Sequence, residues 1–141
     1  MTPIGTCRLY RPDPASIGVA ERWGKAGVTA ALTSAAMVVS VCGEVDAGNA
    51  GRLADYVERH AAVTGALVVD TTAVDFFGAP ALGALHRVDR CCAVGGVGWR
   101  LVAGPALKRV MRACGTTDLP QAENVLSAVR QLGLDRASAG T

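Results

Sequence analysis

The apolar positions of this chain change their spacing along its length, and the changes predict alternating strands and helices. Residues 28–32 and 37–42 are two short runs rich in β-branched and small side chains, which is typical of strands. Residues 33–36 between them predict a hairpin loop. Residues 46–61 instead carry apolar side chains at the spacing of a helix with one buried face, and Asp46 is expected to cap that helix.

The second half of the chain repeats this alternation. It predicts, in order, a strand, a helix, a strand, a helix, a short edge strand and a last helix, at residues 67–70, 80–93, 99–103, 104–115, 119 and 123–132. Strands that alternate with helices imply mostly parallel pairing. We therefore expect one α/β domain with a four- or five-stranded mixed sheet and about four helices on one side.

The two ends of the chain lack such a pattern. Residues 1–25 contain three prolines and scattered charges, which predicts a flexible N-terminal extension. Residues 134–141 are small and polar and predict a flexible tail. The domain is therefore expected to span residues 26–133, and a chain of 141 residues can bury a core of its own.

Composition narrows the classes of function. A formal net charge of +2 with interspersed acids and bases gives no strong attraction to polyanions, so we expect no nucleic acid partner. Five cysteines without a C-x-x-C pair favour a reducing cytoplasm over a disulfide framework or a zinc site. Residues 26–43 are uncharged, but threonines, serines and glycines interrupt them, so we interpret them as the hairpin and expect no membrane insertion.

No enzyme signature is visible. The chain has two histidines, His60 and His86, and both lie in predicted helices without a partnered nucleophile. His86 and Asp89 share a helix face, but this spacing is more typical of solvated helix residues than of a catalytic dyad. The glycines of residues 95–98 precede a strand, so they cannot present the N-terminus of a helix to a phosphate. We therefore predict no catalytic residue, cofactor or metal ligand.

Two loops are the candidates for a binding surface. Residues 43–46 and 75–80 each follow a predicted strand, and open α/β sheets bind partners at the carboxyl ends of their strands. We expect both loops at the same end of the sheet. Phe76 and Phe77 are the two phenylalanines of the chain. One of them should anchor the second loop in the core, and the sequence leaves open which one is exposed.

Four motifs in this order resemble the STAS family, the anti-sigma factor antagonists of bacteria. GEVD at 43–46 is similar to the Gly-Glu-Leu-Asp turn of that family, and LVVD at 67–70 is similar to its central strand. WRLV at 99–102 resembles its last strand. GAPALG at 78–83 falls where the family reads Asp-Ser-Ser-Gly or Asp-Ser-Thr-Gly followed by Leu-Gly.

The resemblance implies a small protein that docks on an anti-sigma factor, in many cases a GHKL-type serine kinase, and so releases a sigma factor. It also implies a docking surface, which by position consists of Glu44, Asp46, Gly78, Ala79, Pro80, Ala81 and Leu82. In the family the kinase ends the signal by phosphorylating the first Ser of the turn, which falls on Ala79 here. Pro80 falls on the second Ser or Thr of the family's turn. The chain therefore keeps the position of the phosphorylation motif and lacks its hydroxyl groups.

The sequence therefore predicts a cytoplasmic, anti-sigma factor antagonist-like binding module without phosphorylation control. Two alternatives stay open. One is a scaffold or decoy subunit of a multi-STAS assembly, and the other is a sensor of a small ligand. A homodimer is compatible with each of these predictions.

Overall fold

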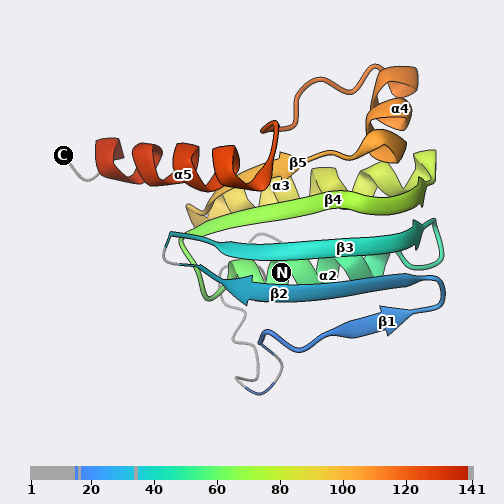
Figure 1. Cartoon of the computed structure of the whole chain (residues 1–141), viewed down its shortest axis with the longest axis horizontal. Coiled ribbons are helices and arrows are strands. Elements are labelled where there is room, and N and C mark those ends of the chain that lie inside the picture. The colour runs from blue at the N-terminus through green and yellow to red at the C-terminus, as the bar shows by residue number, and fades with distance from the viewer. Residues whose placement is uncertain (1–14, 16, 34, 140–141) are drawn as a thin grey trace.

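A computed structural model describes the chain at residue 15 and over residues 17–33 and 35–139 (Figure 1). The elements in chain order are β1 (Glu21–Trp23), β2 (Ala26–Leu32), β3 (Met37–Val45), α2 (Ala50–Ala61), β4 (Ala66–Phe77), the 3-10 helix η2 (Ala79–Ala81), α3 (Leu82–Gly95), β5 (Gly98–Val102), α4 (Pro105–Cys114) and α5 (Val125–Ala139). This order confirms the predicted α/β class.

The five strands form a single mixed sheet in chain order, β1-β2-β3-β4-β5. β1 pairs with β2 and β2 with β3 in antiparallel fashion, whereas β3–β4 and β4–β5 are parallel. The two parallel pairings are joined by crossovers through α2 and α3, as parallel strands require. The carboxyl ends of β3, β4 and β5 therefore meet at one edge of the fold.

Helices cover both faces of the sheet. α2, α3 and α4 contribute to the main core, where Leu53, Leu85 and Leu107 pack with Leu67 and Leu101 of the sheet. α5 packs on the opposite face, and Figure 1 shows it crossing in front of the sheet while α2 and α3 lie behind. The prediction of about four helices on one side is thus corrected: among the described residues, three lie on one side and one on the other.

The position of α5 explains the unbroken apolar run in β4. Successive strand side chains point to opposite faces, so Leu67 and Val69 face α2 and α3 while Val68 faces α5. All three side chains are fully buried. A strand covered on both faces needs apolar side chains at every position, and the run LVV has them.

The folded domain reaches further in both directions than predicted. β1 lies within the predicted flexible extension, and its Trp23 is only 7% exposed and packs edge-on against Tyr56. Residues 1–14 lie outside the described residues. At the other end, α5 continues through the predicted tail as far as Ala139. β1 and the end of α5 therefore lie outside the predicted boundaries at residues 26 and 133.

Two strand predictions are corrected as well. β4 does not end at Asp70 but continues to Phe77, alongside β3. Leu119 is buried but forms no strand. Beside it, the chain makes a single bridge to β5, where the N–H of Leu101 donates to the carbonyl oxygen of Pro120 at 2.7 Å. Proline has no N–H of its own, which prevents a continued ladder at this position.

Candidate functional site

The two predicted loops meet at one end of the sheet, as expected. Val45 at the end of β3 pairs with Phe77 at the end of β4. The N–H of Gly78 then donates to the carbonyl oxygen of Val45 at 2.8 Å. A Cβ atom placed on Gly78 would lie 3.6 Å from the Cα of Asp46. The turn before α2 and the turn before α3 are therefore direct neighbours.

Hydrogen bonds of two side chains hold the turn before α2. Asn49 Oδ1 accepts from the N–H of Asp46 and Asn49 Nδ2 donates to the carbonyl oxygen of Glu44, both at 2.9 Å. Asp46 Oδ1 accepts from the N–H of Gly48 at 2.9 Å. The helix begins at Ala50, so the prediction that Asp46 caps it is wrong, and Asp46 closes the turn ahead of it instead. Asn49 is 7% exposed and was not singled out from the sequence.

The turn before α3 has no such side-chain hydrogen bonds. Gly78 precedes η2 without a capping side chain, and Pro80 occupies the first turn, where a missing N–H costs nothing. Ala79 and Pro80 are exposed, whereas Gly78 is buried. Ala81 is 0% and Leu82 6% exposed, so these two side chains lie in the core beneath the turn. Of the seven predicted docking residues, Glu44, Asp46, Ala79 and Pro80 therefore have side chains that a partner could reach.

Phe76 adds an aromatic ring to this surface. Its side chain is 52% exposed, whereas Phe77 is 1% exposed and belongs to the main core. This settles the alternative that the sequence left open, because successive residues of β4 point to opposite sides. The Phe76 ring lies 3.6 Å from the position of a Cβ atom on Gly78. We call the three exposed apolar residues Phe76, Ala79 and Pro80 the η2 surface.

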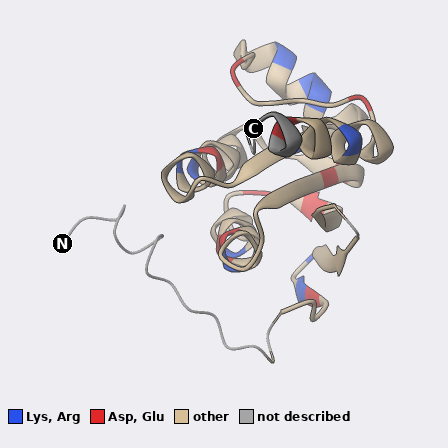
Figure 2. Cartoon of the chain, turned by 90° about the vertical axis from the view of Figure 1, so that its left-hand side faces the viewer, with Lys and Arg blue, Asp and Glu red and all other residues tan. Residues whose placement is uncertain are grey.

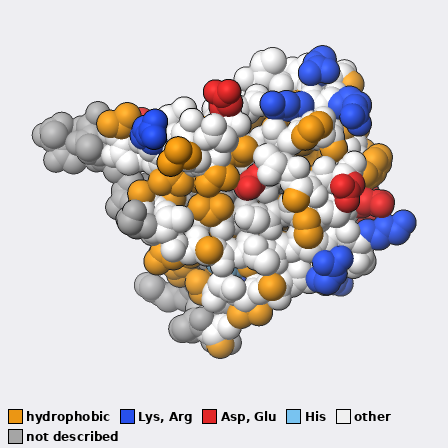
Figure 3. All heavy atoms as spheres, viewed as in Figure 1, with side chains coloured by type: hydrophobic (Ala, Val, Ile, Leu, Met, Phe, Trp, Pro, Cys, Tyr) orange, Lys and Arg blue, Asp and Glu red, His pale blue; other side chains and the backbone are white. Residues whose placement is uncertain are grey.

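Charged side chains surround the η2 surface. Glu44 forms an exposed ion pair with Lys25 at 3.9 Å, and Asp46 and Asp75 are exposed. α4, which lies next to η2, exposes Lys108, Arg109 and Arg112. In Figure 3, basic side chains gather over α4 and acidic ones lie where β3 and β4 end. Over the residues that the structure describes, acidic and basic residues are interspersed (Figure 2).

The hydroxyl groups nearest in sequence lie on β4. Thr71 is fully buried, and its Oγ1 donates to the carbonyl oxygen of Val102 at 2.9 Å. Thr72 is exposed, and its Oγ1 donates to Asp70 Oδ1 at 2.8 Å. Neither hydroxyl lies in the turn before α3, where the family resemblance leads us to expect a Ser.

The candidate catalytic pair of the sequence does not form. His86 Nε2 lies 3.3 Å from Asp118 Oδ1, while Asp89 Oδ1 accepts from Trp99 Nε1 at 2.8 Å. Among the described residues, no group of three or more His, Cys, Asp or Glu side chains could hold a metal ion. Within the same residues, no helix combines the length and apolarity needed to cross a bilayer.

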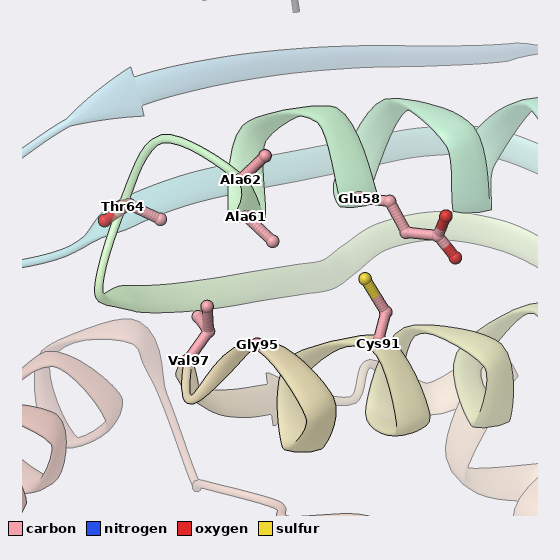
Figure 4. Close-up of a pocket in the computed structure, with 7 residues that line it drawn as sticks. All are labelled: Glu58, Ala61, Ala62, Thr64, Cys91, Gly95 and Val97. Atoms are coloured by element: carbon pink, nitrogen blue, oxygen red, sulfur yellow. The ribbon is translucent and has the colours of Figure 1, made fainter. Parts of the chain in front are cut away.

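A small pocket lies at the opposite end of the sheet. It has a volume of about 120 Å³ and is lined by Glu58, Ala61, Ala62, Thr64, Cys91, Gly95 and Val97. Figure 4 shows Glu58 and Cys91 extending into the gap between α2 and α3. Cys91 is disulfide-bonded, which the cysteine count did not predict. The volume is well below the roughly 300 Å³ at which ligand pockets begin.

Comparison with known proteins identifies the family. The STAS domain model matches residues 28–131, which include all of β3, β4, β5 and both turns. The chain belongs to the STAS domain family. Its mixed five-stranded sheet with four helices has the STAS fold of the solved relatives described next.

Several relatives support this assignment. Osmosensory protein A of Mycobacterium tuberculosis is 30% identical over 122 residues, which cover 86% of this chain and 73% of that protein. The anti-sigma-F factor antagonist RsfA of the same species is 38% identical over 102 residues, or 66% of this chain and 79% of RsfA.

Solved structures agree with the sequence relatives. An anti-sigma factor antagonist from Mycobacterium paratuberculosis superposes with a TM-score of 0.63 and 27% identity, over 76% of this chain and 93% of that one. Moorella thermoacetica RsbS S58E gives a TM-score of 0.64 at 16% identity, over 81% of this chain and 98% of that one, and shows the fold alone.

Proposed function

We propose that this STAS protein is an anti-sigma factor antagonist that docks on an anti-sigma factor through the η2 surface and so frees a sigma factor. The named relatives RsfA and the M. paratuberculosis protein support the class of partner. The observation that carries the docking site is the half-exposed Phe76 ring beside the bare turn of Ala79 and Pro80. Because sigma factors act on RNA polymerase, the protein would work in the cytoplasm, as a binding module rather than an enzyme.

The physical basis of docking is apolar contact with a charged rim. Exposed aromatic side chains are frequent anchors of protein interfaces. Ala79 is small, so a partner can approach the backbone of η2 closely. Glu44, Asp46 and Asp75 on one side, and the cations of α4 on the other, would fix the orientation of the partner more than its affinity.

We further propose that this docking is not controlled by phosphorylation at η2. The family resemblance implies a kinase that adds a phosphate to the first Ser of this turn. The phosphate carries a charge of about −1.5 to −2, which breaks docking by repulsion and desolvation. Ala79 and Pro80 carry no hydroxyl, so a GHKL-type kinase partner would find no acceptor here. The protein would then behave as a permanently unphosphorylated antagonist, limited by its abundance or by a competitor.

Binding measurements with purified anti-sigma factors of the same organism test the proposal. Ala79→Glu should lower the affinity by well over the roughly 0.5 kcal/mol typical of a neutral surface change. Ala93→Glu is the matched control, because Ala93 is also exposed but lies near the far end of α3. Asp46→Ala tests whether the acidic side chains beside the η2 surface contribute to binding. If Ala79→Glu and Asp46→Ala both leave the affinity unchanged, the docking surface lies elsewhere.

A further inference from the structure

The segment that leads into β1, together with the first residue of that strand, is held against α2 by three side chains of that helix. Tyr56 Oη donates to the carbonyl oxygen of Val19 at 2.7 Å, and His60 Nε2 accepts from the N–H of Gly18 at 2.8 Å. Arg59 Nη2 pairs with Glu21 Oε2 at 2.5 Å. The three side chains lie at positions i, i+3 and i+4 of α2 and therefore share one face. We call residues 17–21 the strap.

The hydrogen bonds of His60 define its protonation state in this arrangement. His60 Nδ1 lies 2.8 Å from the carbonyl oxygen of Tyr56, which can only accept, so Nδ1 carries the hydrogen. Nε2 then presents a lone pair to the Gly18 N–H. The neutral ring satisfies both contacts. A protonated ring would place an N–H of Nε2 against the N–H of Gly18, so two donors would face each other without an acceptor.

The surroundings of His60 also disfavour a positive charge. Its side chain is fully buried, and its ring stacks against that of Tyr56 with centroids 4.2 Å apart. Among the described residues, the charged groups that face it are Arg59 on α2 and Glu21 on the strap, and these two pair with each other. Burial lowers the pKa of His60, and the nearby Arg59 adds to this effect, against the opposing influence of the Tyr56 carbonyl and Glu21.

We propose that His60 makes the strap a pH-gated element, bound to α2 while the ring is neutral and released when the ring gains a proton. The sign follows from linkage, because the released state has the higher pKa, close to the ordinary value of about 6.5. The strap is therefore fully bound above that pH and is lost as the pH falls through the pKa of the bound state. Between these two pKa values, the equilibrium constant for binding of the strap to α2 falls about tenfold for each unit by which the pH is lowered. This inference does not depend on the proposed anti-sigma function.

Amide hydrogen exchange on the full-length protein, followed by NMR between pH 8 and pH 5, tests the proposal. The protection factor of the Gly18 amide should fall as His60 titrates, while Val69 in the centre of β4 stays protected. The His60 ring should titrate below its ordinary pKa of about 6.5. Gly18 protection that is constant throughout the His60 titration would overturn the proposal. Loss of Val69 protection at the same pH would also overturn it, because the whole domain would then open.

Two variants separate the role of the ring from general effects of pH. Gln at position 60 can accept the Gly18 N–H but does not titrate, so His60→Gln should abolish the pH dependence of Gly18 protection. His86→Gln is the matched control, since His86 is the partly exposed histidine of α3, and it should leave the pH dependence intact. If His60→Gln retains the full pH dependence, another group gates the strap and the proposal is wrong. If His60→Gln fails to fold, the pH dependence of Gly18 protection in the unmodified protein is by itself the test of the proposal.

Discussion

The two strand-to-helix turns at the proposed docking end of the sheet differ in how they are held. Before α2, the side chains of Asn49 and Asp46 bind the backbone of their own turn. Before α3, no side chain caps η2, and the turn is held by the buried side chains of Ala81 and Leu82 beneath it. The two turns nevertheless touch, through the hydrogen bond from Gly78 to Val45.

This difference separates what the fold needs from what a binding surface needs. The polar turn before α2 fixes the chain direction and would suffer from substitution. The turn before α3 is held by apolar packing and backbone hydrogen bonds without a side-chain cap, so we expect its exposed positions to change without loss of stability. A surface of this kind could lack a modifiable hydroxyl while the fold is preserved, as we propose for Ala79 and Pro80.

The largest effect is expected at Gly43, in β3 just ahead of the polar turn. Its φ is +84°, and an added Cβ would lie 2.0 Å from the carbonyl oxygen of Lys25. Gly43→Ala should therefore lower the free energy of unfolding by about 2–4 kcal/mol, through backbone strain and a forced shift of the neighbouring chain. Urea denaturation measures this loss. Gly51→Ala on the exposed face of α2 is the matched control and should stabilise the protein by up to about 1 kcal/mol. Equal stabilities of the two variants would contradict the account of this turn.

The next effect is expected at Asn49. Asn49→Ala should cost about 2 kcal/mol of the free energy of unfolding, because the carbonyl oxygen of Glu44 and the N–H of Asp46 each lose a partner. Asn124 offers a matched control, since its exposed Oδ1 accepts from the N–H of Ser127 at the start of α5 at 2.8 Å. Asn124→Ala should cost about 1 kcal/mol or less. Thermal or urea unfolding measures both losses. If Asn124→Ala destabilised the protein more than Asn49→Ala, Asn49 would not be the more important of the two side chains for stability.

Phe76 should affect affinity more than stability. Phe76→Ala should weaken binding to the anti-sigma factor by about tenfold or more, as expected of an aromatic anchor at an interface. Because half of the side chain is exposed in the free protein, we expect a smaller effect on the free energy of unfolding. Leu126→Ala serves as the control, since Leu126 is 67% exposed on α5, outside the η2 surface. A similar loss of affinity in both variants would remove the argument for the η2 surface.

The smallest effect on stability is expected in the turn before α3. Gly78 has a φ of −74°, which any residue can adopt, and an added Cβ would make only ordinary contacts at 3.6 Å or more. The double variant Gly78→Asp, Ala79→Ser should therefore unfold within about 0.5 kcal/mol of the unmodified protein. A loss of more than about 2 kcal/mol would show that the bare turn is required by the fold.

Local signals in the sequence predict some elements well. Pro105 and Gly115 bound α4, which runs from Pro105 to Cys114 with Gly115 in the left-handed conformation after it. The alternation of strands and helices likewise predicts the mixed sheet and the meeting of the two turns. These features depend on contacts that are close in sequence or on the direction of neighbouring strands.

Features that depend on distant contacts were missed. β1 is only three residues long, too short for a period, and Trp23 is buried because Tyr56 of α2 lies against it. The choice between Asp46 and Asn49 as the residue before α2 depends on where β3 ends, since both side chains suit that position. The exposure of Phe76 could have been predicted only with the knowledge that β4 continues to Phe77.

The most direct test of the central claim is incubation of the unmodified protein with ATP and an anti-sigma kinase that binds it, followed by mass spectrometry and a binding measurement. We predict that the mass and the affinity stay unchanged, because Ala79 and Pro80 offer no hydroxyl. The double variant Gly78→Asp, Ala79→Ser should gain one phosphate and lose affinity under the same conditions. Stoichiometric phosphate on the unmodified chain, for example at the exposed Thr72, together with loss of binding, would contradict the account and show that the switch has moved to another residue.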